Sequence, residues 1–252
     1  MSKPFKTIFA GLIALAVLPA LAGFEQCKKH FPGGVVPHAR KAPVEQRELC
    51  FDAFAILHSG QSKTPVYVVQ RLSRKTLLDA RDEKRKDRFY EEGRLPWAHR
   101  ARLADYKNSD AAGMRYDRGH MAPAADMPTA AAMAQSFSLA NMVPQAQQNN
   151  RKPWAEIEKA TPKYVMRAKG DVYVFTGPVY GEHVDTLGLN KVWIPKYLFK
   201  LVYDASSNRA WAHWLENTNE ARVSKPLSYE ELVRRTGTKF LPGLHMQIGP
   251  EH

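Results

Sequence analysis

Cysteine is scarce in this 252-residue chain, acidic side chains are outnumbered, and the only long apolar run ends at residue 24. Two cysteines cannot make a cysteine-rich zinc site, so any metal must rely on oxygen and nitrogen ligands. Beyond residue 24 no stretch is long or apolar enough to span a membrane. The sequence also lacks repeats, low-complexity linkers and the patterns of zinc fingers, helix-turn-helix motifs and basic zippers. The common means of reading a base sequence are therefore missing.

The charge of the chain is strongly one-sided. It has 37 Lys and Arg against 25 Asp and Glu, a net charge of +12. Such an excess indicates nucleic acid or an anionic membrane surface as a partner, although a basic solvated surface is the plainer interpretation. Residues 71–102 carry eleven Lys or Arg and six Asp or Glu, including the run EKRKDR at 83–88. We expect this segment to be exposed, either as a solvated loop or along a phosphate backbone.

Residues 1–22 have the pattern of a secretory signal peptide. Two lysines precede a charge-free run from Thr7 to Phe24, and an Ala-Leu-Ala cleavage signature ends at Ala22. The 18 residues of the run are borderline for an uncleaved anchor, and Pro19 favours cleavage. We therefore predict export to the bacterial periplasm or beyond, a single domain over 23–252, and no stable membrane insertion after cleavage.

Cys27 and Cys50 are both near the expected mature N-terminus. In an exported protein an even pair of cysteines favours a disulfide over two free thiols. Such a bond would fasten an otherwise irregular arm over residues 24–50. In the chain-entropy model a loop of this length contributes about 3 kcal/mol.

Short β-rich runs dominate the rest of the chain, with a few helices between them, so the predicted fold class is α+β. A capping box from Ser228 to Glu231 and the later Gly237 mark the start and end of one helix. The pair Thr161-Pro162 is expected to end or restart another. The strands are expected at 54–58, 66–71, 137–142, 172–177, 191–195 and 197–204, and the helices at 128–137, 149–160 and 229–235.

The stretch MRYDRGHMAPAADM at 114–127 places an acid, a base, a glycine and an imidazole side by side: Asp117, Arg118, Gly119 and His120. Taken alone, a histidine in a polar tetrapeptide is more often a surface or hydrogen-bonded residue. The ordinary pKa of His120 nevertheless suits a general base, and Arg118 offers a planar fork for a phosphate. Gly119 is expected to let the backbone turn tightly between them.

A second group follows at a spacing of four residues: Asn150, Trp154 and Glu158. On one helix these three share a face. Asn150 as a helix cap and Trp154 as a core residue are the structural alternatives. The presence of Glu158 on the same face favours a metal site over these structural alternatives. A carboxylate two turns below a carboxamide can hold a metal-bound water without touching the metal. Oxygen ligands and retained water suit Mg²⁺.

At these residues the chain resembles the DNA/RNA non-specific endonuclease family, the ββα-metal nucleases. That family includes secreted bacterial sugar-non-specific nucleases and mitochondrial endonuclease G. The resemblance covers residues 50–245. It rests on four ordered motifs: Asp117-Arg118-Gly119-His120; Asn141 with Pro144 and Gln145; Asn150 with Trp154 and Glu158; and Thr176-Gly177-Pro178.

The resemblance implies a central antiparallel sheet flanked by helices, with a ββα-metal finger as the active site. It implies that His120 is the general base and that Asn150 is the one direct metal ligand. Glu158 would act through a metal-bound water, and Arg118 and Asn141 would assist at the phosphate and around His120. The implied metal is Mg²⁺, with Mn²⁺ as a substitute, and the implied substrates are DNA and RNA.

Two departures from the family pattern concern the rim of the site. The segment at 110–115 is longer than the usual glycine turn, and Pro162 stands where some members carry an arginine. Lys163 or Arg167 are the candidates to replace that arginine.

Two other function classes stay open: an exported nucleic-acid-binding protein without catalysis, and a metal-dependent phosphodiesterase for small nucleotides. The sequence also leaves open a homodimer, an inhibitor protein and the preference between DNA and RNA.

Overall fold

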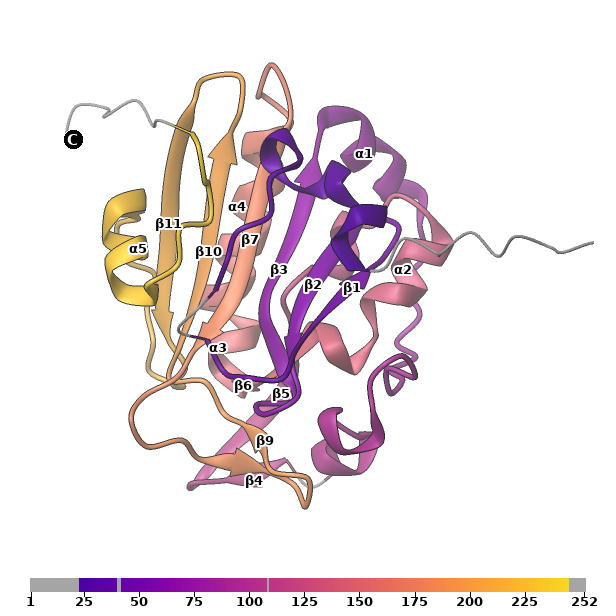
Figure 1. The fold of residues 1–252 in the computed structure, drawn as a ribbon, viewed down its shortest axis with the longest axis vertical. Helices are drawn as coiled ribbons and strands as arrows, with labels where there is room; N and C mark the ends of the chain where they lie inside the picture. The colour runs from indigo at the N-terminus through magenta and orange to yellow at the C-terminus, as the bar shows by residue number, and fades with distance from the viewer. Residues whose placement is uncertain (1–22, 40–41, 108, 245–252) are drawn as a thin grey trace, which may run out of the picture.

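A seven-stranded sheet forms the centre of the molecule (Figure 1). The computed structural model describes residues 23–39, 42–107 and 109–244. Neighbouring strands of this sheet pair antiparallel in the order β1-β2-β3-β7-β10-β11-β12, which confirms the predicted sheet. The strands are β1 (Gln46–Cys50), β2 (Phe54–Ser59), β3 (Thr64–Leu72), β7 (Val172–Val179), β10 (Tyr197–Asp204), β11 (Arg209–Glu216) and β12 (Leu227–Ser228).

The burial of each strand follows its place in the sheet. Strands β7 and β10 are central and buried along nearly their whole length, and their sequences VYVFTGPV and YLFKLVYD are accordingly rich in apolar residues. The edge strand β1 exposes three of its five residues and is much more polar. Continuous apolar runs therefore mark the strands covered on both faces.

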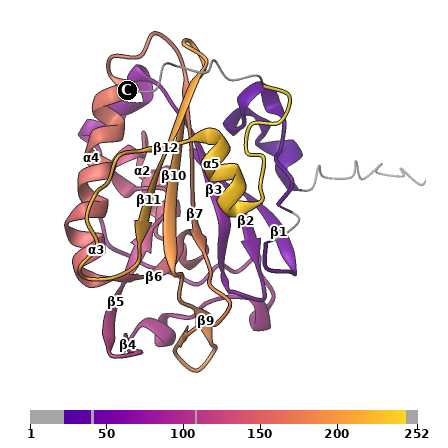
Figure 2. The ribbon, with the colours of Figure 1, turned by 90° about the vertical axis from the view of Figure 1, so that its left-hand side faces the viewer.

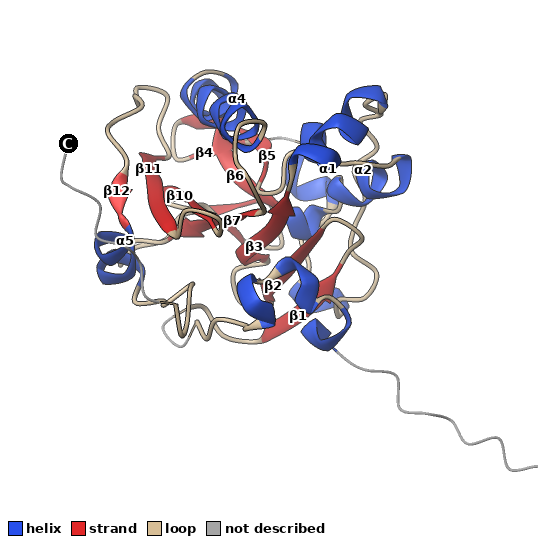
Figure 3. Ribbon diagram, turned by 90° about the horizontal axis from the view of Figure 1, so that it is seen from above, coloured by secondary structure: helices blue, strands red, loops and turns tan. Residues whose placement is uncertain are grey.

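Helices cover both faces of this sheet, which makes the fold α+β as predicted. Figure 2 shows α3 and α4 on one side and α5 on the other, and Figure 3 shows α4 and α5 on opposite sides from above. Helices α1 and α2 lie on the same side as α4, and the short 3-10 turns of the N-terminal arm lie on the side of α5 (Figure 3). The helices are α1 (Arg74–Asp79), α2 (Ala130–Ser136), α3 (Gln147–Arg151), α4 (Pro153–Val165) and α5 (Tyr229–Thr236).

A smaller three-stranded sheet is attached at one end of the central sheet. Its strands are β4 (Asp110–Ala111), β5 (Met114–His120) and β6 (Met142–Ala146), in the order β4-β5-β6. The hairpin of β8 (Thr186–Leu187) and β9 (Val192–Trp193) lies beside β4 (Figure 1). Because α3 follows β6 directly, the chain here has the predicted strand-strand-helix order.

The disulfide between Cys27 and Cys50 is present, as predicted. It ties the N-terminal arm to the end of β1, where Phe24 and Phe31 pack into the core beneath the sheet. No helix in the described part of the chain is long and apolar enough to cross a membrane. Residues 1–22, on which the signal-peptide prediction rests, are outside the described residues.

Several boundaries differ from expectation for identifiable reasons. The expected helix over 149–160 is two helices, because the residue before a proline disfavours the helical conformation. Lys152, which precedes Pro153, has φ −121° and ψ −90°. The expected stop at Thr161-Pro162 is wrong, since α4 continues to Val165. Its buried residues at 154, 157, 161 and 165 pack against the core, and that burial outweighs one lost backbone hydrogen bond.

Other parts of the prediction differ in extent. The arm over 24–50 is not wholly irregular, because its end forms β1, and β11 was not predicted at all. The segment at 137–142 is mostly a 3-10 turn (Leu139–Asn141), and the strand begins only at Met142. The hairpin of β2 and β3, strands β7 and β10, and helices α2 and α5 are confirmed.

Candidate active site

The small sheet places the Asp-Arg-Gly-His motif beside the start of α3. In the pairing of β5 with β6, Arg118 lies opposite Pro144 and His120 lies opposite Met142. Helix α3 then turns back and contacts β5. Residues that are about 30 positions apart in the sequence, Asp117 and Asn150, are thereby brought into hydrogen-bond contact.

His120 lies at the end of β5 with a free ring nitrogen. Its imidazole packs between the rings of Phe89 and Phe137, at centroid distances of 5.9 and 5.1 Å. Its Nε2 is buried and has no hydrogen-bond partner. Burial lowers the pKa of His120 to about 3, and the positive charge of Arg85 acts in the same direction. The imidazole is therefore neutral at ordinary pH, so one of its ring nitrogens carries a free lone pair.

Asp117 fixes the orientation of Asn150. The Asn150 Nδ2 donates to Asp117 Oδ2 at 3.0 Å, and Arg151 binds both oxygens of the same carboxylate at 2.9 and 3.0 Å. With its nitrogen held by Asp117, Asn150 presents its amide oxygen, Oδ1, without a hydrogen bond from any other described residue. The acid of the motif is thus a positioning residue for the amide.

Glu158 and Trp154 lie on the buried side of α4, beneath this region. The Glu158 Oε1 and the Trp154 Nε1 are both buried without a hydrogen-bond partner. Burial raises the pKa of Glu158 to about 7, an effect that the nearby Lys200 opposes and Asp126 reinforces. The positive charge of Arg85 lowers the pKa values of both Glu158 and His120.

These oxygens fit a hydrated Mg²⁺. The free Oδ1 of Asn150 and the unpartnered Oε1 of Glu158 are hard oxygen donors, and an added cation would favour the ionised form of Glu158. Among the described residues no three His, Cys, Asp or Glu side chains converge on one point. An ion held here would keep most of its water, which is the usual state of Mg²⁺ in proteins.

Arg118 and Arg85 supply the positive charge around His120. The Arg118 guanidinium lies over the ring of Phe89 at 4.1 Å, and that of Arg85 lies over Phe137 at 5.5 Å. These are the same two rings that enclose the imidazole of His120. Arg118 was predicted, but Arg85 was noted only as part of a basic run. Its place beside His120 depends on a loop that no local pattern locates.

Asn141 and Gly119 have structural duties that differ from expectation. Asn141 is 0% exposed, and its side chain bonds only to backbone, accepting from Ala122 and donating to Ala122 and Ser136 at 2.9 Å each. It holds the chain just after His120. Gly119 does not make a turn, because it lies within β5. It is required because a Cβ there would lie 2.1 Å from the side chain of Gln145.

A row of polar side chains crosses the central sheet beneath α4. Thr176 on β7 pairs with Lys200 on β10, which pairs in turn with His213 on β11. Lys200 is 1% exposed, and its Nζ donates to Thr176 Oγ1 at 3.0 Å and lies 5.4 Å from the ring of Trp154. Sequence reasoning missed this lysine, because its strand reads as an ordinary apolar run.

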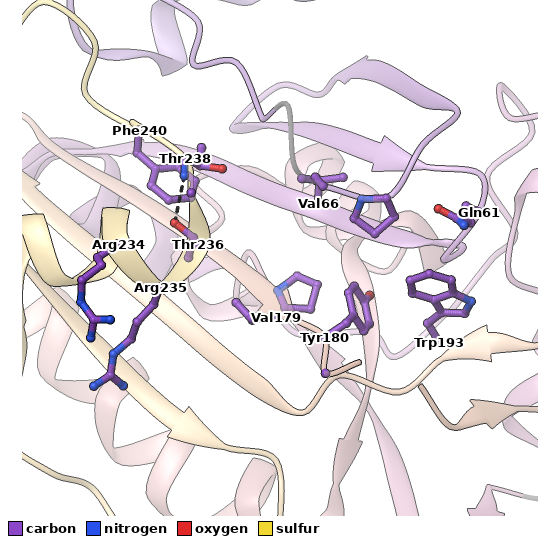
Figure 4. Close-up of a pocket in the computed structure, with 15 residues that line it drawn as sticks. Gln61, Val66, Val179, Tyr180, Trp193, Arg234, Arg235, Thr236, Thr238 and Phe240 are labelled. Carbon is purple, nitrogen blue, oxygen red and sulfur yellow. Dashed lines mark hydrogen bonds between the residues drawn. The ribbon is translucent and has the colours of Figure 1, made fainter. Parts of the chain in front are cut away.

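One large cavity of the described structure is not at this site. Figure 4 shows it between the end of α5, with Arg235 and Phe240, and the residues Tyr180 and Trp193. Its volume is about 530 Å³. None of the predicted catalytic or metal-binding residues lines it, so it has no part in the chemistry described above.

Known proteins resemble this chain over most of its length. The profile of the family described as DNA/RNA non-specific endonuclease matches residues 32–247. Mitochondrial endonuclease G of Homo sapiens is 26% identical over 217 residues, covering 79% of this chain and 70% of that protein. A nuclease of Nostoc sp. is 28% identical over 232 residues, covering 86% of this chain and 80% of that protein.

The fold is also similar to that of a solved structure. A chain in the crystal structure of the EndoG/EndoGI complex, which concerns the mechanism of EndoG inhibition, superposes with a TM-score of 0.69 at 22% sequence identity. The match covers 81% of this chain and 89% of that chain.

Proposed function

Because the chain belongs to the DNA/RNA non-specific endonuclease family, we propose that it is an exported Mg²⁺-dependent nuclease that cuts both DNA and RNA with little sequence preference. Members of this family are metal-dependent nucleases, so the chain is a hydrolase of this type. The single observation that carries the finer proposal is the neutral, unpartnered Nε2 of His120, whose ring is enclosed by the same two phenylalanines on which Arg118 and Arg85 stack.

In the proposed reaction His120 is the general base. Its Nε2 takes a proton from water as the water oxygen attacks phosphorus, the bond from phosphorus to the leaving 3′ oxygen breaks, and that oxygen is protonated by solvent. Arg118 binds the phosphate oxygens through its planar fork. Asn150 would hold the Mg²⁺, with Glu158 acting through bound water. When present, the ion supplies positive charge for the transition state and the leaving oxygen.

Weak sequence preference follows from what the site acts on. His120, Arg118 and the Asn150 amide address the phosphate, which is common to DNA and RNA. Charge and phosphate contacts fix a protein on a backbone without reading bases. Activity is therefore expected to fall steeply as salt rises, because each neutralised phosphate releases counterions.

The test is cleavage of supercoiled plasmid, single-stranded DNA and RNA, with Mg²⁺ and with excess EDTA. Asn150→Ala should abolish Mg²⁺-dependent cutting. Glu158→Ala should raise the Mg²⁺ requirement about 10- to 100-fold, as changes behind a metal ligand typically do. Glu156→Ala, at an exposed position of the same helix, is the matched control. Full activity in EDTA, or inertness toward one of the two polymers, contradicts the proposal.

Export is the other part of the proposal. It is supported by the apolar N-terminal run with its cleavage signature, and by a disulfide, which persists in oxidising compartments. The mature protein should begin at or near Gly23, and its intact mass should be two hydrogens below that of the reduced chain. Two thiols that titrate freely in unfolded, non-reduced protein would argue against an oxidising compartment.

A further inference from the structure

Helix α3, which carries Asn150, does not stabilise its own first turn. Its N-cap residue is Ala146, which makes no side-chain hydrogen bond to the free amide groups there. The helix has five residues, and at Lys152 the backbone leaves the helical conformation before α4 begins. Because so short a helix is marginal on its own, contacts from other segments decide where α3 lies.

Asn217, the first residue after β11, holds the junction between β6 and α3. Its side chain is buried, with the residue 5% exposed, and it bonds to backbone groups. The Oδ1 accepts from the N–H of Ala146 at 2.8 Å, and the Nδ2 donates to the carbonyl oxygens of Pro144 and Pro195 at 3.0 and 2.9 Å. One buried amide therefore fixes the stretch of chain from which α3 begins.

Asn219 caps α3 from a distant part of the sequence. Its Oδ1 accepts from the N–H of Gln148, the second residue of α3, at 3.0 Å and across 71 sequence positions. An N-cap side chain ordinarily makes this bond to the second or third helical residue. Figure 2 shows the chain between β11 and β12 running beside α3. Asn219 itself is exposed, so its side chain can be changed without opening the core.

Asn149 supplies a third contact, on the buried side of α3. Its Nδ2 donates to the carbonyl oxygen of Glu216 at 2.6 Å, and its Oδ1 accepts from the Gln145 Nε2 at 2.8 Å. Residues 216–219 thus bond to positions 144, 146, 148 and 149, immediately before Asn150.

We propose that Asn217 and Asn219 are positioning residues for Asn150: by fixing α3 they set the place of its amide oxygen and, with it, the affinity of the site for a metal ion. Asp117 holds Asn150 through the end of its side chain. Residues 216–219 instead hold the backbone from which that side chain starts. Asn150 needs both, because a side chain fixed only at its end still moves with its backbone, and metal sites depend on such supporting contacts.

This inference rests on the proposed function, in which Asn150 holds Mg²⁺. Changes behind a metal ligand typically lower metal affinity about 10- to 100-fold. Asn217→Ala should reach that range, because it removes three hydrogen bonds. Asn219→Ala removes one and should raise the metal requirement about 5-fold, the fold-change that corresponds to losing one N-cap.

The first measurement is the binding of Mn²⁺ without nucleic acid, followed by the paramagnetic resonance signal of the free ion. The second is the Mg²⁺ concentration that gives half-maximal cleavage of plasmid. Asn219→Asp should return both values to near wild type, since aspartate also caps helices. Asn217→Asp should not, because a carboxylate has no donors for Pro144 and Pro195. Glu220→Gln, at the next exposed position, is the matched control.

Amide hydrogen exchange at residues 148–151 reports on α3 directly. It should be faster in Asn219→Ala and return to the wild-type rate in Asn219→Asp. Because Asn219 is exposed, its variants decide the test even if Asn217→Ala does not fold. If Asn219→Ala binds Mn²⁺ and requires Mg²⁺ as the wild type does, or if Asn219→Asp is impaired as strongly as Asn219→Ala, the assignment is wrong. If the wild-type protein itself binds no Mn²⁺ and cuts fully in EDTA, the proposed metal role fails, and this inference with it.

Discussion

Both faces of the central sheet pack apolar side chains, but only the face beneath α4 also carries a buried row of polar residues. The face beneath α5 and the N-terminal arm is packed with aromatic rings: Phe24, Phe31, Tyr67, Phe175, Phe199 and Phe240. The face beneath α4 carries the polar row of Thr176, Lys200 and His213, with Glu158 above it. On the aromatic face the rings contact one another, whereas on the polar face Glu158 Oε1 and His213 Nδ1 lack partners.

This difference between the two faces indicates which of them mainly stabilises the fold and which supports the chemistry. Buried aromatic rings contribute free energy of folding through the area that they remove from water. Buried charges and unpaired polar atoms cost free energy, and such costs concentrate at functional sites. Substitutions on the two faces are therefore expected to separate stability from activity.

The largest effect is expected from the site itself. His120→Ala should lower turnover about 10²- to 10⁴-fold, the range for loss of a general base. DNA binding should survive. The free energy of unfolding should fall only through the lost packing of the imidazole against Phe89 and Phe137, because the Nε2 makes no hydrogen bond that the substitution would break. Single-turnover cleavage and chemical denaturation provide the two measurements. Near wild-type cleavage by this variant would remove His120 from the role of base.

On the aromatic face the expected result is reversed. Phe175→Ala should lower the free energy of unfolding by about 3–5 kcal/mol, because Phe175 is 0% exposed and contacts three other rings. The folded fraction should cut at close to the wild-type rate. If turnover per folded molecule fell as far as in His120→Ala, the separation between the two faces would not hold.

Lys200 tests whether the polar face supports the site. In Lys200→Met the carboxyl groups of Glu158 and Asp126 lose the positive charge that opposes the effect of burial on their pKa values. Their pKa values should rise further, so Glu158 stays protonated to higher pH. The onset of Mg²⁺-dependent activity should then move to higher pH, with about a 10-fold larger metal requirement.

The matched control for this variant is Lys239→Met, at an exposed position. Unfolding of Lys200→Met should be affected less than that of Phe175→Ala, since the carboxyl groups can neutralise themselves by taking up protons. An unshifted pH profile in a folded Lys200→Met protein would show that the lysine serves only packing.

The smallest effect concerns a histidine away from the site. His58 is 0% exposed with both ring nitrogens unpartnered, and burial lowers its pKa to about 3. Between its ordinary pKa near 6.5 and this value the unfolded chain binds a proton that the folded protein does not. Stability should therefore fall as pH decreases through this window, by up to about 1.4 kcal/mol per pH unit for this histidine.

His58→Phe should make that decline shallower, as measured by chemical denaturation at pH 7 and pH 5. His38→Phe, at an exposed position, is the control and should retain the wild-type slope. If stability declined equally with pH in all three proteins, the folded protein would accommodate a protonated His58.

The candidate site could be predicted as far as its residues are neighbours in the sequence. Asp117 to His120 are consecutive in the sequence, so their chemistry can be inferred without knowledge of the fold. Trp154 and Glu158 are one helical turn apart in α4, as their spacing indicates. For Asn150 the prediction was only partly right. The common helix expected for Asn150, Trp154 and Glu158 is interrupted at Lys152. The Asn150 amide is instead oriented by Asp117, which lies on β5.

The sequence by itself determined the fold class, the paired cysteines and the group of residues that resembles a nuclease site, because each is written in local composition, spacing or periodicity. Tertiary structure alone decided that Arg85 and Lys200 act on that group, and that the Asn141 side chain bonds to the backbone just after His120. The physical reason is that burial and charge–charge contacts between distant segments depend on strand pairing, above all that of β3 with β7 and of β7 with β10, and no short-range pattern records such pairings.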